Sequence, residues 1–217
     1  MLSALMLAAA LTGTSPDSTP ADPLASAIEH YHTVESYRVT IHSFHADGEE
    51  HIRYYYKKPG FVRMEFIRPH DGAVLVYNPL TQRVRLWPFG ADSFPEFNLS
   101  PGNPLIRSSR GQHVDRSDVG ALLENVRTLR AGDDAEILDT CPGTREGMYG
   151  HICLHLVVTG AGSFAVADVH RYELWLDTAS QFPVKVISRD QQDAIIETVM
   201  MQALETNVAF QETLFNP

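Results

Sequence analysis

The sequence predicts a mainly β protein with added α-helix, in which a long, curved antiparallel sheet is covered on its apolar face by two helices. Short segments that alternate apolar and polar residues, separated by turn residues, predict the strands. Two further segments carry apolar residues at helical spacing. No linker divides the strand segments, so we expect a single domain over residues 23–217.

We expect the first 22 residues to be a signal-like segment followed by a linker. Residues 2–11 form an apolar run that is too short to span a bilayer but is typical of the core of a secretory signal. The basic residues that usually precede such a core are missing, and a disordered N-terminal tail is the alternative. A secretory signal would place the protein in the periplasm of a Gram-negative-type envelope.

Caps and apolar spacing predict the two helices. Asp22 caps the first helix, with Pro23 at its first position. Ser117 or Asp118 caps the second. The stripes that should face the sheet include Ile28, Tyr31, Leu122 and Val126.

Strands are predicted wherever the apolar period changes to two. The segments are 38–42, 51–57, 61–66, 73–77, 83–87, 135–139, 151–158, 170–176, 184–189 and 194–202. Asp47 and Gly48 supply a hairpin turn after the first of them. Residues 88–111 are predicted to be a loop, and loops of this length often form lids or binding sites.

Cys141 and Cys153 are the two cysteines of the chain, so one pairing is available. They flank a stretch with Pro142, Gly143, Gly147 and Gly150, which can turn back on itself. A structural disulfide is the preferred prediction, since an oxidising compartment favours it. A metal or redox pair is the alternative, although the spacing is not CxxC.

Charge and motifs argue against several functions. The formal net charge of −10 disfavours nucleic acid as a partner and disfavours unaided binding to an anionic membrane. The ten histidines lack the spacing of metal ligands, so no metal site is predicted. Phosphate-binding loops and hydrolase or metalloprotease motifs are also missing, and we therefore expect no cofactor and no enzymatic activity.

Several motifs, taken in order, resemble those of the outer-membrane lipoprotein carriers, the LolA-like and LppX-like group. A strand ends in YYKKP at residues 55–59, and residues 61–69 follow with an R-x-E strand and a proline turn. Later, WLD at 175–177 precedes FPVK at 182–185, and residues 207–217 form a tail of similar pattern. The resemblance covers most of the chain from Leu24. It implies a half-barrel sheet with helices as a lid, and an apolar cavity that holds acyl chains during transit of the periplasm.

Within this resemblance, inward-facing apolar residues become candidates for the cavity, with ordinary core packing as their alternative. These candidates are Ile28, Tyr31, Ile52, Tyr54, Tyr56, Val62, Met64, Phe66, Leu122 and Val126. The helices and the loop near Phe94 and Phe97 would form the lid. Lys58 would lie at the lid hinge, where the family has an arginine; lysine is a point charge and lacks the planar fork of donors.

The expected function is a carrier that binds acyl chains of a lipid or lipoprotein and shuttles them toward the outer membrane. Its partners would be an inner-membrane donor protein and an outer-membrane acceptor protein. The alternative is a periplasmic lipid-sensing or interaction module that signals to a protein partner. A hydrolase is a more distant alternative.

Overall fold

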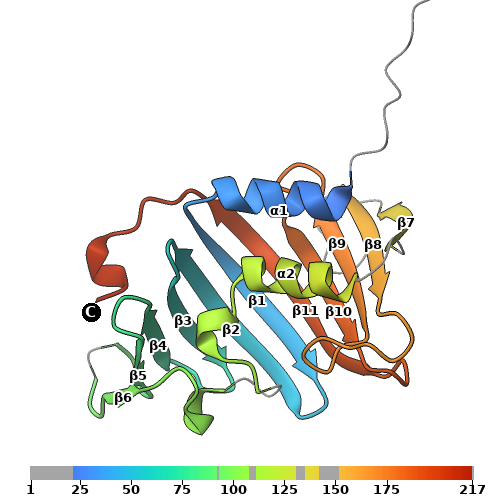
Figure 1. Cartoon of the computed structure of the whole chain (residues 1–217). Helices are drawn as coiled ribbons and strands as arrows, with labels where there is room; N and C mark the ends of the chain where they lie inside the picture. The colour runs from blue at the N-terminus through green and yellow to red at the C-terminus, as the bar shows by residue number, and fades with distance from the viewer. Residues whose placement is uncertain (1–21, 92, 108–110, 131–134, 142–151, 217) are drawn as a thin grey trace, which may run out of the picture.

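The computed structural model describes residues 22–91, 93–107, 111–130, 135–141 and 152–216, with the backbone alone described for 135–141. These residues form one antiparallel sheet of eleven strands (Figure 1). The strand order is β6-β5-β4-β3-β2-β1-β11-β10-β9-β8-β7, so two meanders meet where β1 pairs with β11.

The helices and the first meander have the following bounds. Helix α1 spans Pro23–Thr33 and α2 spans Val119–Leu129. The strands are β1 (Ser36–His45), β2 (Gly48–Lys57), β3 (Phe61–Arg68), β4 (Val74–Asn78), β5 (Arg83–Trp87) and β6 (Phe97–Leu99).

The second meander and the short 3-10 turns complete the fold. The strands are β7 (Ala135–Cys141), β8 (Cys153–Thr159), β9 (Arg171–Asp177), β10 (Pro183–Arg189) and β11 (Ile195–Thr206). The 3-10 turns are η1 (Pro104–Ile106), η2 (Val114–Arg116) and η3 (Glu212–Leu214).

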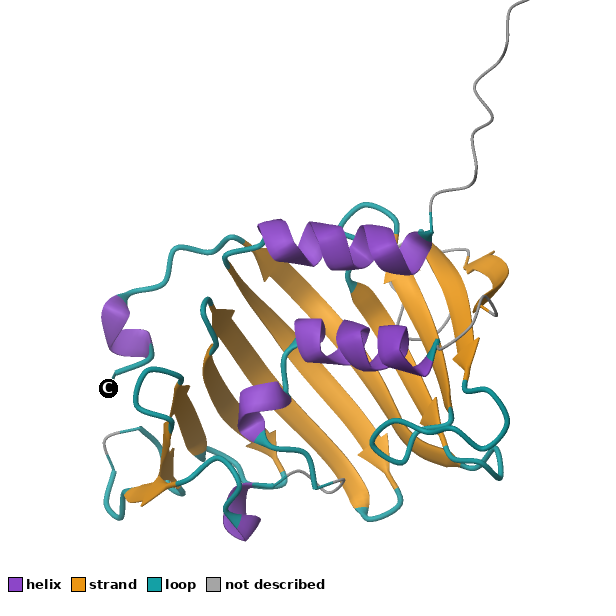
Figure 2. Ribbon diagram, viewed as in Figure 1, coloured by secondary structure: helices purple, strands orange, loops and turns teal. Residues whose placement is uncertain are grey.

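Both helices begin where their caps predict. The Asp22 carboxylate accepts a hydrogen bond from the amide of Leu24, and Pro23 opens α1. Asp118 caps α2 through the amide of Ala121. Figure 2 shows the helices lying across the same, concave face of the curved sheet. The predicted class, a curved antiparallel half-barrel covered by helices, is confirmed.

One strand was not predicted. The segment expected to be entirely loop contains β6, whose three residues pair with Val84, Arg85 and Leu86 of β5. Three residues are too few to show a period of two, and the surrounding proline and glycine residues favour a loop. Strand β6 forms because its backbone pairs with the edge of β5 that is otherwise free.

The main core lies between the concave face and the two helices. Inward-facing residues of both meanders contribute to it, together with Leu24 of α1 and Leu123, Val126 and Leu129 of α2. A second, smaller cluster lies on the convex face. There the C-terminal tail packs Phe215 against Val74, Val76 and Trp87.

Candidate functional site

A groove lies between the concave face of β2–β5 and the segment that contains η1 and η2. Its larger part is a pocket of about 320 Å³. A smaller pocket of about 160 Å³ continues toward β1, β11 and α2. The two share the lining residues Glu50, Ile52, Met64, Gln112 and Ser117, so they form one continuous space, here called the concave groove.

A row of register partners crosses five strands, and its first four members line the concave groove. Tyr54 of β2 lies opposite Met64, followed by Leu75, Leu86 and finally Phe97 of β6. The row begins at a side chain that is 2 % exposed and ends at one that is 40 % exposed. Neighbouring strands lie about 4.8 Å apart, so the row is about 19 Å long. We call it the apolar row.

Polar side chains gather where the two pockets join. Glu50 lines both pockets, and burial raises the pKa of its carboxyl above the usual range, with the nearby Glu197 adding to the shift. Ser43 donates a hydrogen bond to Glu197 at 2.5 Å. Ser188, also buried, lines the same part of the smaller pocket. This stretch of the groove therefore carries carboxylates and hydroxyl groups, and the larger pocket has further polar side chains from His70, Arg107, Gln112 and His113.

Tyrosine hydroxyl groups fix the beginning of α2, which covers the smaller pocket. Tyr31 of α1 donates to the Asp118 carboxylate at 2.7 Å. Tyr37 accepts from the amide of Val119 at 3.1 Å, and Tyr54 lies 3.1 Å from the Ser117 hydroxyl. Burial raises the pKa of Tyr31 well above its ordinary value, and the Asp118 charge adds to the shift. The raised pKa keeps the Tyr31 hydroxyl protonated at neutral pH, where it donates this hydrogen bond.

Known structures with a similar fold include an uncharacterized conserved protein from Thermus thermophilus, with 12 % identity and a TM-score of 0.51, over 88 % of this chain and 90 % of that one. The Mycobacterium tuberculosis lipoprotein LppX has 10 % identity and a TM-score of 0.51, over 89 % of this chain and 99 % of LppX. The chain has the LppX fold. A LolA superfamily protein from Nitrosomonas europaea matches at a TM-score of 0.36, with 12 % identity over 91 % of this chain and 99 % of that one. No protein-family model and no curated protein matches the sequence.

In this LppX-like fold the predicted cavity residues divide into two groups. The groove is lined by Ile52, Tyr54, Met64, Phe66 and Leu122. The remaining candidates line neither pocket and belong to the packed interior around the helices: Ile28, Tyr31, Tyr56, Val62 and Val126.

Packing under α1 explains this division. The Tyr31 ring lies 6.2 Å from the rings of both Tyr56 and Phe182, measured between centroids, and this aromatic group fills the space that a ligand would need. The hollow is displaced toward β3–β5, where η1 and η2 cover the sheet less completely. Leu75, Leu86, Leu105 and other lining residues were not among the candidates. Alternation along β4 and β5, and the length of the loop that was expected to be a lid, are the signals that could have found them.

Lys58, the predicted lid hinge, lies at the opposite end of β2 from the groove. Its Nζ donates to the carbonyl oxygen of His32 at 2.7 Å and to the Glu35 carboxylate at 3.1 Å. These contacts join the end of β2 to the end of α1. A role in lid movement stays a prediction.

Cys141 and Cys153 are register partners on β7 and β8. Directly opposed residues of an antiparallel pair have Cα atoms about 4.5–5.5 Å apart, which suits a disulfide. Cys153 is fully buried, and the side chain of Cys141 lies outside the described residues, so the bond stays a prediction. Residues 1–21, which contain the predicted signal, also lie outside them.

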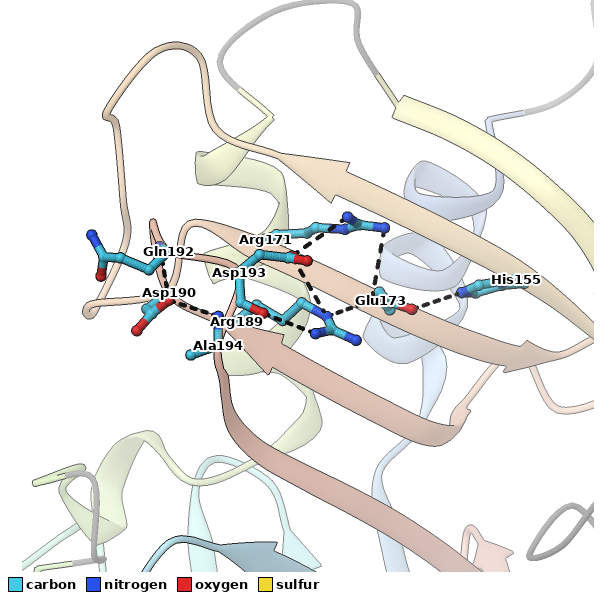
Figure 3. A network of polar contacts seen from close by, with 8 residues as sticks. All are labelled: His155, Arg171, Glu173, Arg189, Asp190, Gln192, Asp193 and Ala194. Carbon is cyan, nitrogen blue, oxygen red and sulfur yellow. Dashed lines mark hydrogen bonds and ion pairs between the residues drawn. The ribbon is translucent and has the colours of Figure 1, made fainter.

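The convex face carries a separate polar cluster around Glu173 (Figure 3). Its buried carboxylate accepts from Arg189 at 2.8 Å and lies 3.8 Å from Arg171 and 3.5 Å from His155. Burial lowers the pKa of His155 despite the neighbouring carboxylate. The cluster joins β8, β9 and β10. With two arginines around one carboxylate, it is a structural ion-pair network.

In the described part of the chain, histidine, cysteine and acidic residues form no group of three or more that could hold a metal ion. None of its helices has the length and apolar character needed to cross a bilayer.

Proposed function

We propose that the chain binds an acyl chain of a lipid or lipoprotein in the concave groove and carries it across the periplasm toward the outer membrane, without catalysing a reaction. The observation that carries this proposal is the apolar row beside a pocket of about 320 Å³. Small-molecule sites usually have volumes of about 300–1,000 Å³ and mostly apolar linings. The fold shared with the lipoprotein LppX supports the same assignment.

The length of the apolar row suits a single acyl chain. The hydrocarbon core of a bilayer is about 30 Å thick and holds two chains end to end, so one chain needs about 15 Å. The row of about 19 Å accommodates that length when the chain lies across the strands. The polar stretch at Glu50 then lies beside one part of the ligand and the apolar row beside the rest.

An open groove also favours release of the ligand. Full burial of an acyl chain with about sixteen CH₂ groups would be worth about 13 kcal/mol at about 0.8 kcal/mol each. A groove open along one side buries about half of that surface, which leaves about 6 kcal/mol and a Kd in the tens of micromolar. A carrier needs affinity of this order, because its ligand has to leave at the acceptor.

Native mass spectrometry of freshly purified protein tests the proposal. We expect the spectrum to show a bound species with the mass of an acyl lipid. Leu122→Glu places a carboxylate in the groove and should remove that species. Thr128→Glu adds the same charge at an exposed position of the same helix and should keep it. Circular dichroism confirms that both variants fold. Wild-type protein that never carries or takes up an acyl lipid would contradict the proposal.

A further inference from the structure

Four polar side chains on the inner face of the sheet form a cluster in the concave groove. Ser43 and Glu50 are register partners on β1 and β2, and Ser188 and Glu197 are register partners on β10 and β11. Because β1 pairs with β11, the four residues lie on neighbouring strands in the middle of the sheet (Figure 1). All four line the smaller pocket. We call them the acceptor cluster, because two carboxylates and two hydroxyl groups offer more acceptors than donors.

Two members of the acceptor cluster have hydrogen-bonding capacity that the described residues leave unused. Ser188 is 3 % exposed and lines the pocket, yet its hydroxyl forms no hydrogen bond with any described residue. Glu50 likewise forms no hydrogen bond or ion pair with them, although the imidazoles of His45 and His70 lie close enough to influence its pKa. Buried polar groups in proteins are usually hydrogen-bonded. Unpaired groups that open on a cavity therefore point to a ligand.

The charge of the smaller pocket is negative. Its described lining residues include the carboxylates of Glu50, Glu197 and Asp118, and one basic residue, Arg116, which is exposed on η2. The Asp118 carboxylate is already bonded as the cap of α2. The other two carboxylates lie close enough for the charge of Glu197 to raise the pKa of Glu50. A cation placed between these two carboxylates would offset their repulsion.

An organic ammonium group suits the acceptor cluster. The described histidine, cysteine and acidic residues form no group that could hold a metal ion. An ammonium group has three N–H donors and no acceptor, which complements carboxylates and a free hydroxyl. A carboxylate or phosphate at the same place would be repelled by Glu50 and Glu197. Ile52 and Met64 line both pockets, so a chain attached to the ammonium group continues from the cluster along apolar surface.

We propose that the acceptor cluster binds the primary ammonium group of an amine-bearing acyl lipid, while the acyl chain lies along the apolar row. Glu50 and Glu197 each accept a charge-assisted hydrogen bond from the ammonium group, and the Ser188 hydroxyl accepts the third. The groove then selects its ligand by the head group as well as by the chain. This inference rests on the proposed function, because it assigns the groove an acyl ligand.

Native mass spectrometry with three single-chain ligands tests this selection. Hexadecylamine, hexadecanol and palmitic acid are offered together in equal amounts from cyclodextrin, so the ligands differ in their head groups. We expect the wild type to favour the amine, with an occupancy ratio of amine to alcohol at least about tenfold higher than in Glu50→Gln. Glu49→Gln removes the same charge at an exposed neighbour that lines neither pocket, and should keep the wild-type ratio. Circular dichroism confirms that both variants fold.

Three results would overturn the ammonium site. They are a wild type that takes up palmitic acid or hexadecanol as readily as the amine, a Glu50→Gln variant with the wild-type ratio, and a Glu49→Gln variant that loses the preference equally. The last would show a nonspecific attraction of the amine to the negative net charge. Each of these results still has acyl chains in the protein and leaves the proposed function standing. Protein that takes up none of the three ligands contradicts both proposals.

Discussion

The hydrogen bond between Tyr31 and Asp118 joins the two helices that cover the sheet, and its removal gives a quantitative prediction. Tyr31→Phe deletes a donor that lies 2.7 Å from a carboxylate oxygen and keeps the ring in place. Hydrogen bonds to charged groups contribute about 1.5–3 kcal/mol. Asp118 keeps its bond from the Ala121 amide, so we expect the lower end of that range, about 1.5 kcal/mol.

Urea unfolding followed by circular dichroism measures this change. With a slope of about 2 kcal/mol per molar urea, the midpoint of the Tyr31→Phe variant should fall by about 0.75 M. Tyr77→Phe is the matched control. Its ring is also buried, and its hydroxyl has no hydrogen bond among the described residues, so the midpoint should change little. Equal midpoints for the two variants would refute the assignment of this bond as the connection between the helices.

Three further predictions follow from the same region and from β7–β8. An alanine Cβ at Gly120 would lie 2.3 Å from the ring of Tyr31, so Gly120→Ala should displace the two helices and lower the urea midpoint. An unchanged midpoint would contradict this close approach. The pKa of the Glu50 carboxyl is raised in the folded protein, so its ionisation lowers the stability. This cost is full above the folded pKa, decreases as the pH falls below it, and is gone below the pKa of the unfolded chain. Glu50→Gln should therefore stabilise the protein at pH 7 but not at low pH, while Glu49→Gln, exposed next to it, should have little effect at either; a Glu50→Gln effect independent of pH would count against this. Cys141 and Cys153 should resist thiol labelling in unfolded, unreduced protein and react after reduction, and reduction should cost about 2–3 kcal/mol of stability; two reactive thiols before reduction would exclude the disulfide.

The strands could be predicted because each buries one face, and burial of one face leaves a period of two in the sequence. Tyr54 and Met64 were placed on the inner face in this way, and so were Tyr56 and Val62. The pattern cannot distinguish these two pairs, because both are apolar and inward. Only the position of α1 decides that Tyr56 is packed against the helix while Met64 faces the groove.

The contacts that hold the beginning of α2 in place over the sheet could not be predicted for a similar reason. Tyr37 and Val119 are separated by 82 positions in the chain, and a single sequence does not reveal that a hydroxyl meets an amide across that distance. The caps of α1 and α2 were predictable because Asp22 and Asp118 bond to amides within a few residues. Local hydrogen bonds are visible in the sequence, and long-range ones depend on the fold.

Photo-crosslinking with a diazirine-bearing fatty acid, followed by peptide mapping, tests the central claim most directly. We predict saturable labelling of peptides that contain Met64, Leu86 and Leu105, with competition by unlabelled fatty acid. Labelling that does not saturate, or that is confined to the convex-face cluster around Trp87 and Phe215, would contradict the assignment of the concave groove as the acyl-binding site.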